Sequence, residues 1–324
     1  MANAVHDLIR IKTPTPISRK VLLIAGEESG DIYAGRLISH LMKISPGLRV
    51  EGIGGDRMRK SGGHTFYDIS EMSTVGFISV IGRIPFYRRV LKNLNSRIAS
   101  GEYDSIILID YPDFNLRVAK MAEKSGVPVF YYVCPQFWAW RRYRVRAVRK
   151  LVDMMIVVFS FEEDFYLKQG VNARFLGHPI LDEAKLPEEK ERVKLRKKLG
   201  AGPTDTLLGL LPGSRNSEIR DMAPIMLESL KTIRAINPVK VVIPCADSID
   251  STLLEKIVAD SGEEALIVKG KTWETMCASD FLICKSGTST LQAAIAGTPM
   301  VIVYKQDAFS YHIAKYLAYV QWVG

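Results

Sequence analysis

Val21-Leu-Leu-Ile-Ala25 runs directly into Gly26-Glu-Glu-Ser-Gly-Asp31, and this junction decides the fold class. The consecutive apolar residues predict a buried strand. The glycine-containing loop then opens a helix that runs to about Met42, with Ser29 or Asp31 available as its cap. Strand, loop and helix in this order form the repeating unit of α/β proteins.

The same unit recurs through the first half of the chain. Apolar runs predict strands at Ser105–Ile109, Val127–Val133 and Met154–Phe159, and Phe114–Lys124 has a helical pattern. Buried parallel strands alternate in sequence with helices that cover both faces of a sheet. We therefore expect a Rossmann-like domain over residues 21–180, preceded by an N-terminal extension over residues 1–20.

A second domain is expected over residues 181–324. The charged, helical segment Glu188–Lys198 follows Gly177-His-Pro179, whose proline disfavours helix at the residue before it, and the boundary is placed there. The alternation then resumes with five strands: Leu207–Leu211, Val239–Ile243, Ala265–Val268, Phe281–Cys284 and Met300–Val303. The second half is therefore also Rossmann-like.

Composition and charge exclude several classes of protein. With 324 residues and 47% hydrophobic residues, the chain can bury a large core. Its apolar runs are far shorter than the roughly 20 residues that cross a bilayer, and no export signal is recognisable, so a cytoplasmic location is expected. Residues 1–180 hold 26 Lys and Arg against 17 Asp and Glu, and residues 181–324 hold 18 of each. The whole net charge of +9 thus lies in the first half, which favours contact with an anionic surface, either nucleic acid or anionic lipid. The alternative is a basic domain that is merely soluble.

Neither a metal nor a cofactor is expected. The four cysteines lie in or beside apolar runs without metal-binding spacing, which predicts buried free thiols. The chain has no Asp-x-Asp, no Gly-x-x-x-x-Gly-Lys-Ser/Thr loop and no complete Gly-x-Gly-x-x-Gly. Kinase and dehydrogenase functions are therefore disfavoured.

Two strand ends of the first domain carry candidate catalytic carboxylates. Open parallel sheets bind ligands beyond the carboxyl ends of their strands. Asp110 follows an apolar strand that would desolvate it and raise its proton affinity, as a general base requires. Asp113 is instead expected to cap the next helix. Glu27 and Glu28 follow the first strand, although acids there also stabilise the start of a helix.

Two loops of the second domain are candidates for phosphate binding. Gly213, Ser214 and Arg215 follow one predicted strand, and Ser286-Gly287-Thr288 follows another. Backbone N–H groups at a helix start bind phosphate, and an arginine adds a charged contact. Serine and threonine also cap helices for stability alone, but two such loops together favour a nucleotide diphosphate.

Seven motifs occur in an order and spacing that resemble one family, lipid-A-disaccharide synthase. They are Ala25-Gly-Glu-Glu-Ser-Gly-Asp31, Gly52-Ile-Gly-Gly-Asp-Arg-Met58, Ile109-Asp-Tyr-Pro-Asp-Phe-Asn115, Tyr132-Val-Cys-Pro-Gln-Phe-Trp-Ala-Trp-Arg141, Phe175-Leu-Gly-His-Pro179, Leu211-Pro-Gly-Ser-Arg215 and Ser286-Gly-Thr-Ser-Thr290. The similarity runs from Val21 to Gly324.

This resemblance implies a GT-B fold, with two Rossmann-like domains facing each other across a cleft. It also implies metal-independent, inverting transfer of 2,3-diacylglucosamine from UDP-2,3-diacylglucosamine to 2,3-diacylglucosamine 1-phosphate. The family's essential acids fall on Glu27 and Asp110, its diphosphate-binding arginine on Arg215, and its nucleotide loop on Ser286, Gly287 and Thr288. Asp110 is expected to deprotonate the acceptor hydroxyl.

The chain departs from the family's pattern at two places. Gln292 stands where relatives usually carry a glutamate suited to the ribose hydroxyls, so uridine binding is expected to be weaker. The end at Tyr319–Gly324 corresponds to a point where relatives continue, so a truncated C-terminal end with poor activity is expected. A homodimer is left open.

The acylated substrates require contact with a membrane. Met72–Ile98 mixes apolar residues with cations, as interfacial segments do. The residues expected to face the acceptor and the anionic inner-membrane surface, on its cytoplasmic side, are Phe77, Ile81, Arg83, Phe86, Arg88 and Arg89. The alternative is that the apolar residues belong to the core and the arginines to a solvated face.

Two rival functions remain from the sequence. One is another GT-B enzyme acting on UDP-N-acetylglucosamine, either an epimerase or an N-acetylglucosaminyltransferase. The other is RNA binding through Trp138–Lys150, which interleaves aromatic residues with cations, although such a stretch is also a solvated helix face. The favoured interpretation has no nucleic-acid partner.

Overall fold

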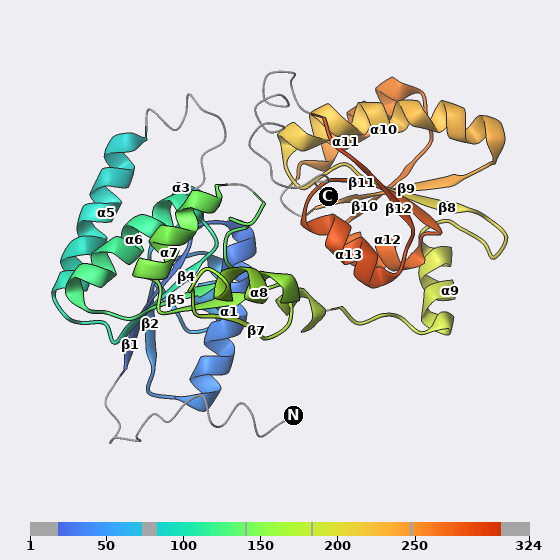
Figure 1. Ribbon diagram of the computed structural model, residues 1–324. Helices are drawn as coiled ribbons and strands as arrows, with labels where there is room; N and C mark the ends of the chain where they lie inside the picture. Colours follow the sequence, from blue (N-terminus) through green and yellow to red (C-terminus); the bar gives the residue numbers. More distant parts are fainter. Residues whose placement is uncertain (1–18, 73–82, 140, 183, 247–248, 306–324) are drawn as a thin grey trace. The chain divides into compact units, whose positions relative to one another are not determined.

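The computed structural model describes residues 19–72, 83–139, 141–182, 184–246 and 249–305. The chain divides into two compact units, with the division between His178 and Pro179 (Figure 1). Each unit contains one sheet, and every strand pair in both sheets is parallel. The expected α/β class with two parallel sheets is confirmed.

Unit 1 holds a seven-stranded sheet in the order β3-β2-β1-β4-β5-β6-β7. Its strands are β1 (Lys20–Ala25), β2 (Arg49–Gly54), β3 (His64–Asp68), β4 (Ser105–Ile109), β5 (Val129–Tyr132), β6 (Met154–Val157) and β7 (Ala173–Phe175). Its helices are α1 (Glu28–Ile44), α2 (Asp56–Lys60), α3 (Ile69–Met72), α5 (Ile84–Ala99), α6 (Pro112–Ser125), the 3-10 turn η1 (Arg142–Arg144), α7 (Val145–Leu151) and α8 (Ser160–Leu167).

Helices cover both faces of this sheet. Alternate residues of β1 belong to two different apolar clusters, because side chains alternate across a strand. Leu23 packs with Ala34 and Ile38 of α1. Leu22 packs with residues of α5 and α6 on the opposite face, among them Leu94. Residues Val21–Ala25 of β1 are buried, so β1 lies in the middle layer of a three-layer unit.

Unit 2 repeats the plan around a five-stranded sheet in the order β10-β9-β8-β11-β12. Its strands are β8 (Leu207–Leu211), β9 (Lys240–Cys245), β10 (Leu266–Lys269), β11 (Phe281–Lys285) and β12 (Met300–Val303). Its helical elements are the 3-10 turn η2 (Pro179–Asp182), α9 (Glu189–Lys198), α10 (Asn216–Ile236), α11 (Ser251–Ser261), α12 (Thr272–Ala278) and α13 (Thr288–Ala296). Leu208 packs with the α10 side, and Leu207 packs with Leu199 beside α9.

The predicted cap of α1 is wrong. The helix begins at Glu28 with Glu27 as its cap residue, and both Ser29 and Asp31 lie inside it. The Asp31 carboxylate is buried and accepts hydrogen bonds at 2.6, 2.9 and 3.1 Å from the backbone N–H groups of Gly55, Arg57 and Met58. It therefore ties the start of α1 to the start of α2.

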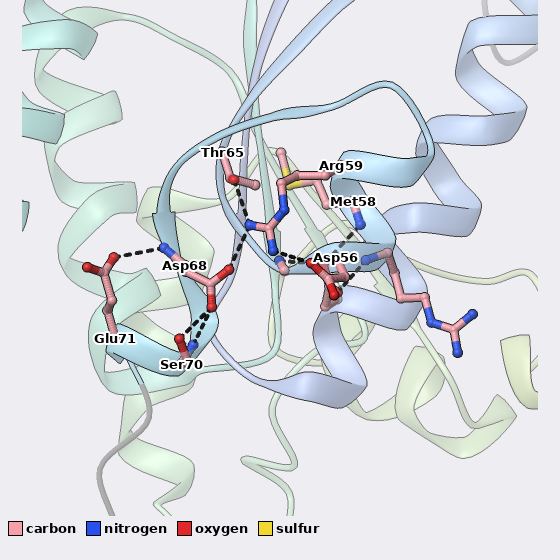
Figure 2. A network of polar contacts seen from close by, with 10 residues as sticks. Asp56, Met58, Arg59, Thr65, Asp68, Ser70 and Glu71 are labelled. Atoms are coloured by element: carbon pink, nitrogen blue, oxygen red, sulfur yellow. Dashed lines mark hydrogen bonds and ion pairs between the residues drawn. The ribbon is translucent and has the colours of Figure 1, made fainter. Parts of the chain in front are cut away.

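A polar network fixes the carboxyl end of β3 (Figure 2). The Arg59 guanidinium on α2 donates to Thr65 Oγ1 at 3.0 Å and Asp68 Oδ2 at 2.6 Å, and it also contacts Asp56. Asp68 Oδ1 in turn accepts from the backbone N–H of Ser70 at 2.9 Å. These contacts join α2, β3 and α3 near the end of the first described range, residues 19–72.

Two further expectations concern the whole chain. Cys134, Cys245, Cys277 and Cys284 are all buried free thiols, as the sequence predicts. Across the part of the chain that the structure describes, no helix has the length and apolar character needed to span a bilayer.

Candidate functional site

Asp110 lies at the carboxyl end of β4, beside the end of β1. The two strands are paired, with Ala25 opposite Ile109, so Gly26 and Glu27 leave the sheet next to Asp110. The Glu27 side chain is exposed, whereas Asp110 is half-buried. The two predicted catalytic acids are thus brought together at one edge of the sheet.

The backbone at this edge is held in an uncommon conformation. Asp110 and Tyr111 have φ angles of 44° and 51°, and Val133 at the end of neighbouring β5 has 53°. The Asp110 carbonyl accepts from Tyr131 Oη at 2.6 Å and Asn115 Nδ2 at 2.7 Å, and its N–H donates to the Val133 carbonyl at 3.2 Å. Hydrogen bonds therefore fix both backbone groups of Asp110. They also fix the direction in which its side chain leaves the backbone.

The Asp110 carboxyl binds protons more tightly than an ordinary aspartate. Burial disfavours its charged form, and the nearby Glu27 carboxylate adds repulsion, so its pKa rises to about 6. The backbone N–H of Tyr111 opposes this rise. A carboxyl with a pKa near 6 is ionised at neutral pH and still basic enough to accept a proton from a hydroxyl in a transition state.

Tyr111 closes the space above Gly26. A Cβ placed on Gly26 would lie 2.3 Å from the Cδ1 atom of the Tyr111 ring, so only glycine fits there. The Tyr111 hydroxyl donates to the Met72 carbonyl at 3.3 Å, which also accepts from Tyr87 at 2.6 Å. The aromatic ring therefore connects the loop carrying Glu27 with α3 and α5.

Asp113 does not cap α6, contrary to the prediction. The cap residue of α6 is Tyr111, whose side chain makes no cap hydrogen bond, and Pro112 occupies the first turn. The exposed Asp113 carboxylate instead accepts from Arg144 Nη2 at 2.5 Å and lies 3.3 Å from Arg141 Nη1. Asp113, which lies three residues after Asp110, thereby holds two arginines of the segment that follows β5.

A buried carboxylate positions the tryptophan of the same segment. Glu162 in α8 is fully buried and accepts from Trp138 Nε1 at 2.8 Å. Its other oxygen accepts from the backbone N–H groups of Val158 and Phe159 at 3.1 and 3.0 Å. Burial raises the pKa of Glu162, although these three donors favour its charged form.

The two candidate phosphate loops of unit 2 are adjacent, because β8 pairs with β11. Glu218 lies between them: its carboxylate accepts from the Ser214 N–H at 2.9 Å, from Arg215 at 3.2 Å and from Lys285 Nζ at 2.9 Å. Burial opposes its ionisation, but Lys285 and the Ser214 N–H outweigh burial and lower its pKa. The carboxylate thus joins both loops through one set of contacts.

The remaining predicted nucleotide residues lie around these contacts. Arg215 is the cap residue of α10 and is exposed, with 62% of its side chain accessible. Gly213 has a φ of 133° and no room for a Cβ, which would lie 2.4 Å from Glu218 Oε2. Gly287 and Thr288 are exposed at the start of α13, and Ser286 and Gln292 are half-buried.

The expected membrane-facing residues are only partly visible, since Phe77 and Ile81 lie outside the described residues. Phe86 is half-buried and packs against the core, edge-on to Tyr67 and Tyr87. Arg83 donates to the Glu71 carbonyl at 2.9 Å. Arg88 and Arg89 are exposed, as are Ile84 and Pro85 at the start of α5. Among the described residues of this segment, the two arginines and Lys92 are thus exposed cations that follow the exposed first turn of α5.

Sequence reasoning missed several residues that shape the two sites. These are Tyr111, Glu162, Lys285, Glu218 and the pair Arg141 and Arg144. The signal for Glu218 was its place in the first turn after the Gly-Ser loop, where acids reach back to backbone N–H groups. Nothing local in the sequence links Glu162 with Trp138, because 24 residues separate them.

Comparisons with known proteins identify the family of the chain. The family model described as lipid-A-disaccharide synthetase matches residues 21–324. A relative named lipid-A-disaccharide synthase, from Geobacter sulfurreducens, is 38% identical over 308 residues, which cover 95% of this chain and 80% of the relative.

Two solved structures share the fold at low sequence identity. A UDP-GlcNAc 2-epimerase from Neisseria meningitidis bound to UDP-GlcNAc has a TM-score of 0.59 at 12% identity and covers 91% of this chain and 85% of its own. MurG from Acinetobacter baumannii has a TM-score of 0.51 at 13% identity, with 92% and 81% covered. The chain therefore has the GT-B fold.

Proposed function

Because the chain belongs to the lipid-A-disaccharide synthetase family, we propose that it joins two acylated glucosamine units in lipid A biosynthesis. The donor is UDP-2,3-diacylglucosamine and the acceptor is 2,3-diacylglucosamine 1-phosphate. Their products are a β-1,6-linked disaccharide 1-phosphate and UDP. The enzyme is a hexosyltransferase that inverts the configuration of the transferred sugar.

The observation that carries this proposal is the state of Asp110. Inversion by one displacement requires a base that takes the proton of the acceptor 6-hydroxyl while UDP leaves from the opposite face of the sugar. The half-buried Asp110, with a pKa raised to about 6, has this property. Glu27 raises that pKa and contributes to positioning the acceptor hydroxyl.

The donor's UDP group is assigned to the two loops of unit 2. Arg215 supplies a charged contact to the diphosphate. The loop of Ser286, Gly287 and Thr288 lies at the start of α13, and backbone N–H groups at the start of a helix bind anions. Gly213 and Ser214 complete the first loop. The Gln292 amide forms hydrogen bonds with the ribose hydroxyls, either as acceptor or as donor. The sugar diphosphate is held without a metal ion.

Both substrates carry acyl chains, so the enzyme acts at the cytoplasmic face of the inner membrane as a peripheral protein. Exposed Arg88 and Arg89, next to exposed Ile84 and Pro85, are the described residues suited to an anionic lipid surface. Cosedimentation with vesicles tests this part: binding should require anionic lipid and weaken as salt rises. Replacing Arg88 and Arg89 by serine should reduce it.

Formation of the disaccharide is the decisive test of the activity. The purified protein is incubated with both acylated substrates in detergent, and the lipid product and UDP are separated by thin-layer chromatography. Formation of the disaccharide together with an equimolar amount of UDP supports the proposal. Conversion of UDP-N-acetylglucosamine without an acylated acceptor would instead identify an epimerase.

A further inference from the structure

Lys285 is the last residue of β11 and lies outside both predicted phosphate loops. Ile283 packs with the apolar cluster on the α10 side of the sheet, and Cys284 packs on the opposite side with Ala293 of α13. Because side chains alternate along a strand, the Lys285 side chain leaves β11 on the α10 side. The strand that leads into the second loop therefore directs a lysine towards the helix that follows the first loop.

The Lys285 ammonium lies close to both loops. Its Nζ atom donates to Glu218 Oε1 at 2.9 Å, and Arg215 Nη1 donates to the same oxygen at 3.2 Å. A Cβ placed on Gly287 would lie 4.0 Å from Lys285 Nζ. One ammonium is thus close to the arginine of the first loop and to the glycine of the second.

Several contacts hold this ammonium in position. Only 17% of the Lys285 side chain is accessible, and Nζ lies over the Tyr304 ring, 5.3 Å from its centre. Glu218 is held in turn, because its Oε2 atom accepts from the Ser214 N–H at 2.9 Å. A side chain that is already ordered loses less conformational entropy when a ligand binds to it.

The charges around Glu218 suit a ligand with several negative charges. Two cations share one carboxylate oxygen, and they come from different strand ends. Among the described residues, the hydrogen-bond acceptor of Lys285 is Glu218, whereas an ammonium has three N–H donors. Half-burial also reduces the screening of the charge by salt. A diphosphate has adjacent charged groups that match two neighbouring cations.

We propose that Lys285 binds the diphosphate of the UDP-sugar together with Arg215, and that Glu218 positions both cations. This inference rests on the proposed function, because it places the donor's diphosphate at these two loops. When the bond between the sugar and the diphosphate breaks, its electron pair stays on the diphosphate oxygen. Lys285 stabilises the charge that develops there.

Calorimetry with UDP and with uridine tests the contact with the diphosphate. In Lys285→Met the Kd of UDP should rise about tenfold or more, because a charge-assisted contact is lost. The Kd of uridine, which has no phosphate, should be the same for parent and variant. The proposal would be overturned by equal Kd values of UDP, by equal weakening of UDP and uridine, or by a parent that does not bind UDP.

Two further variants separate a contact with phosphate from a structural bridge to Glu218. Lys285→Gln keeps an N–H donor for Glu218 but carries no charge, so it should bind UDP as weakly as Lys285→Met. Lys285→Arg keeps the charge and should bind UDP more tightly than Lys285→Gln. Parent-like binding of UDP by Lys285→Gln would show that the lysine only joins the loops, and the proposal would be wrong. This variant also carries the test if Lys285→Met does not fold.

Lys240→Met is the matched control. Lys240 is the exposed first residue of β9, the strand next to β8, and it therefore lies at the amino edge of the same parallel sheet. Both loops follow carboxyl ends of strands, at the opposite edge. The control removes an equal charge and should leave the Kd of UDP unchanged. Equal weakening in Lys240→Met and Lys285→Met would indicate a general effect of charge and refute the proposal.

Disaccharide formation separates this inference from the proposed function. If the parent binds UDP but forms no disaccharide, the proposed function fails, and Lys285 is still judged by the binding of UDP. If the disaccharide forms, Lys285→Gln should raise the KM of the UDP-sugar without changing the KM of the acceptor. An unchanged donor KM in an active Lys285→Gln variant would leave the proposed function intact and refute the role of Lys285.

Discussion

Replacing Asp110 by asparagine should remove most of the turnover and at the same time stabilise the fold. The two side chains have nearly the same shape, and asparagine tolerates the positive φ of 44° at this position. The backbone contacts of Asp110 with Tyr131, Asn115 and Val133 do not involve the side chain and remain. The substitution therefore changes charge and basicity while leaving the geometry of the edge intact.

The size of the stabilisation follows from the pKa. Folding raises the pKa of Asp110 from 3.8 to about 6, and each unit corresponds to about 1.4 kcal/mol. Above pH 6 the carboxylate is charged in both states, so the folded state carries a penalty of about 3 kcal/mol at most. As pH falls from 6 to 4, the folded state takes up its proton first and the penalty disappears. The variant's advantage should thus be largest at neutral pH and absent near pH 4.

The loss of activity should be about a hundredfold or more, the usual contribution of a general base. In the parent, kcat/KM should fall as pH drops below about 6, because protonated Asp110 cannot accept the acceptor's proton. The residual activity of Asp110→Asn should not show this fall of kcat/KM below about pH 6. Disaccharide formation is measured from pH 5 to 9, and urea unfolding at pH 7.5 and at the lowest pH where the protein stays folded.

Exposed Asp164 on α8 supplies the matched control, since Asp164→Asn removes the same charge far from the sheet edge in sequence. It should leave both activity and stability unchanged. Parent-like turnover in Asp110→Asn would refute its role as the base. A variant that is less stable than the parent at pH 7.5 would refute the argument from burial.

Three other substitutions test the surroundings of the two sites. Glu27→Gln removes a charge that raises the pKa of Asp110, so the acid limb of the rate profile should move to lower pH; an unmoved limb would contradict the coupling. Arg215→Ala should raise the KM of the UDP-sugar about tenfold with little effect on the acceptor, and an unchanged donor KM would count against its contact with the diphosphate. Gly26→Ala should cost about 1–3 kcal/mol in urea unfolding, because its methyl group would meet the Tyr111 ring at 2.3 Å, and a parent-like midpoint would show that the ring moves aside.

Strands whose sequences are apolar and uninterrupted were predictable. Ser105–Ile109, Leu207–Leu211 and Met300–Val303 are observed with the predicted bounds. The edge strands β3 and β7 and the neighbouring strand β2 were not predicted as strands. Arg49–Gly54 alternates charged residues and glycines with two apolar residues, and His64–Asp68 is mostly polar, so neither shows the continuous apolar pattern of a buried strand.

The predicted site residues were found from their places at strand ends, and parallel topology explains why this works. Pairing of β1 with β4 brings Glu27 and Asp110 to one edge, and pairing of β8 with β11 brings the two loops of unit 2 together. The partners of the carboxylates could not be predicted in the same way. Asp31 and Asp113 were both interpreted as caps, but each binds groups more than 20 residues away that only the tertiary fold places beside it.

The left-handed backbone at the ends of β4 and β5 limits how the enzyme could be made more robust. Asp110, Tyr111 and the β-branched Val133 each hold a positive φ that costs an L-residue roughly 1–2 kcal/mol. A laboratory selection for heat resistance alone would favour glycine or asparagine at these positions. Such replacements would remove the carboxylate, the ring above Gly26 or the stiffness of the neighbouring strand end. Thermostable variants obtained without an activity screen are therefore expected to lose function first at this edge.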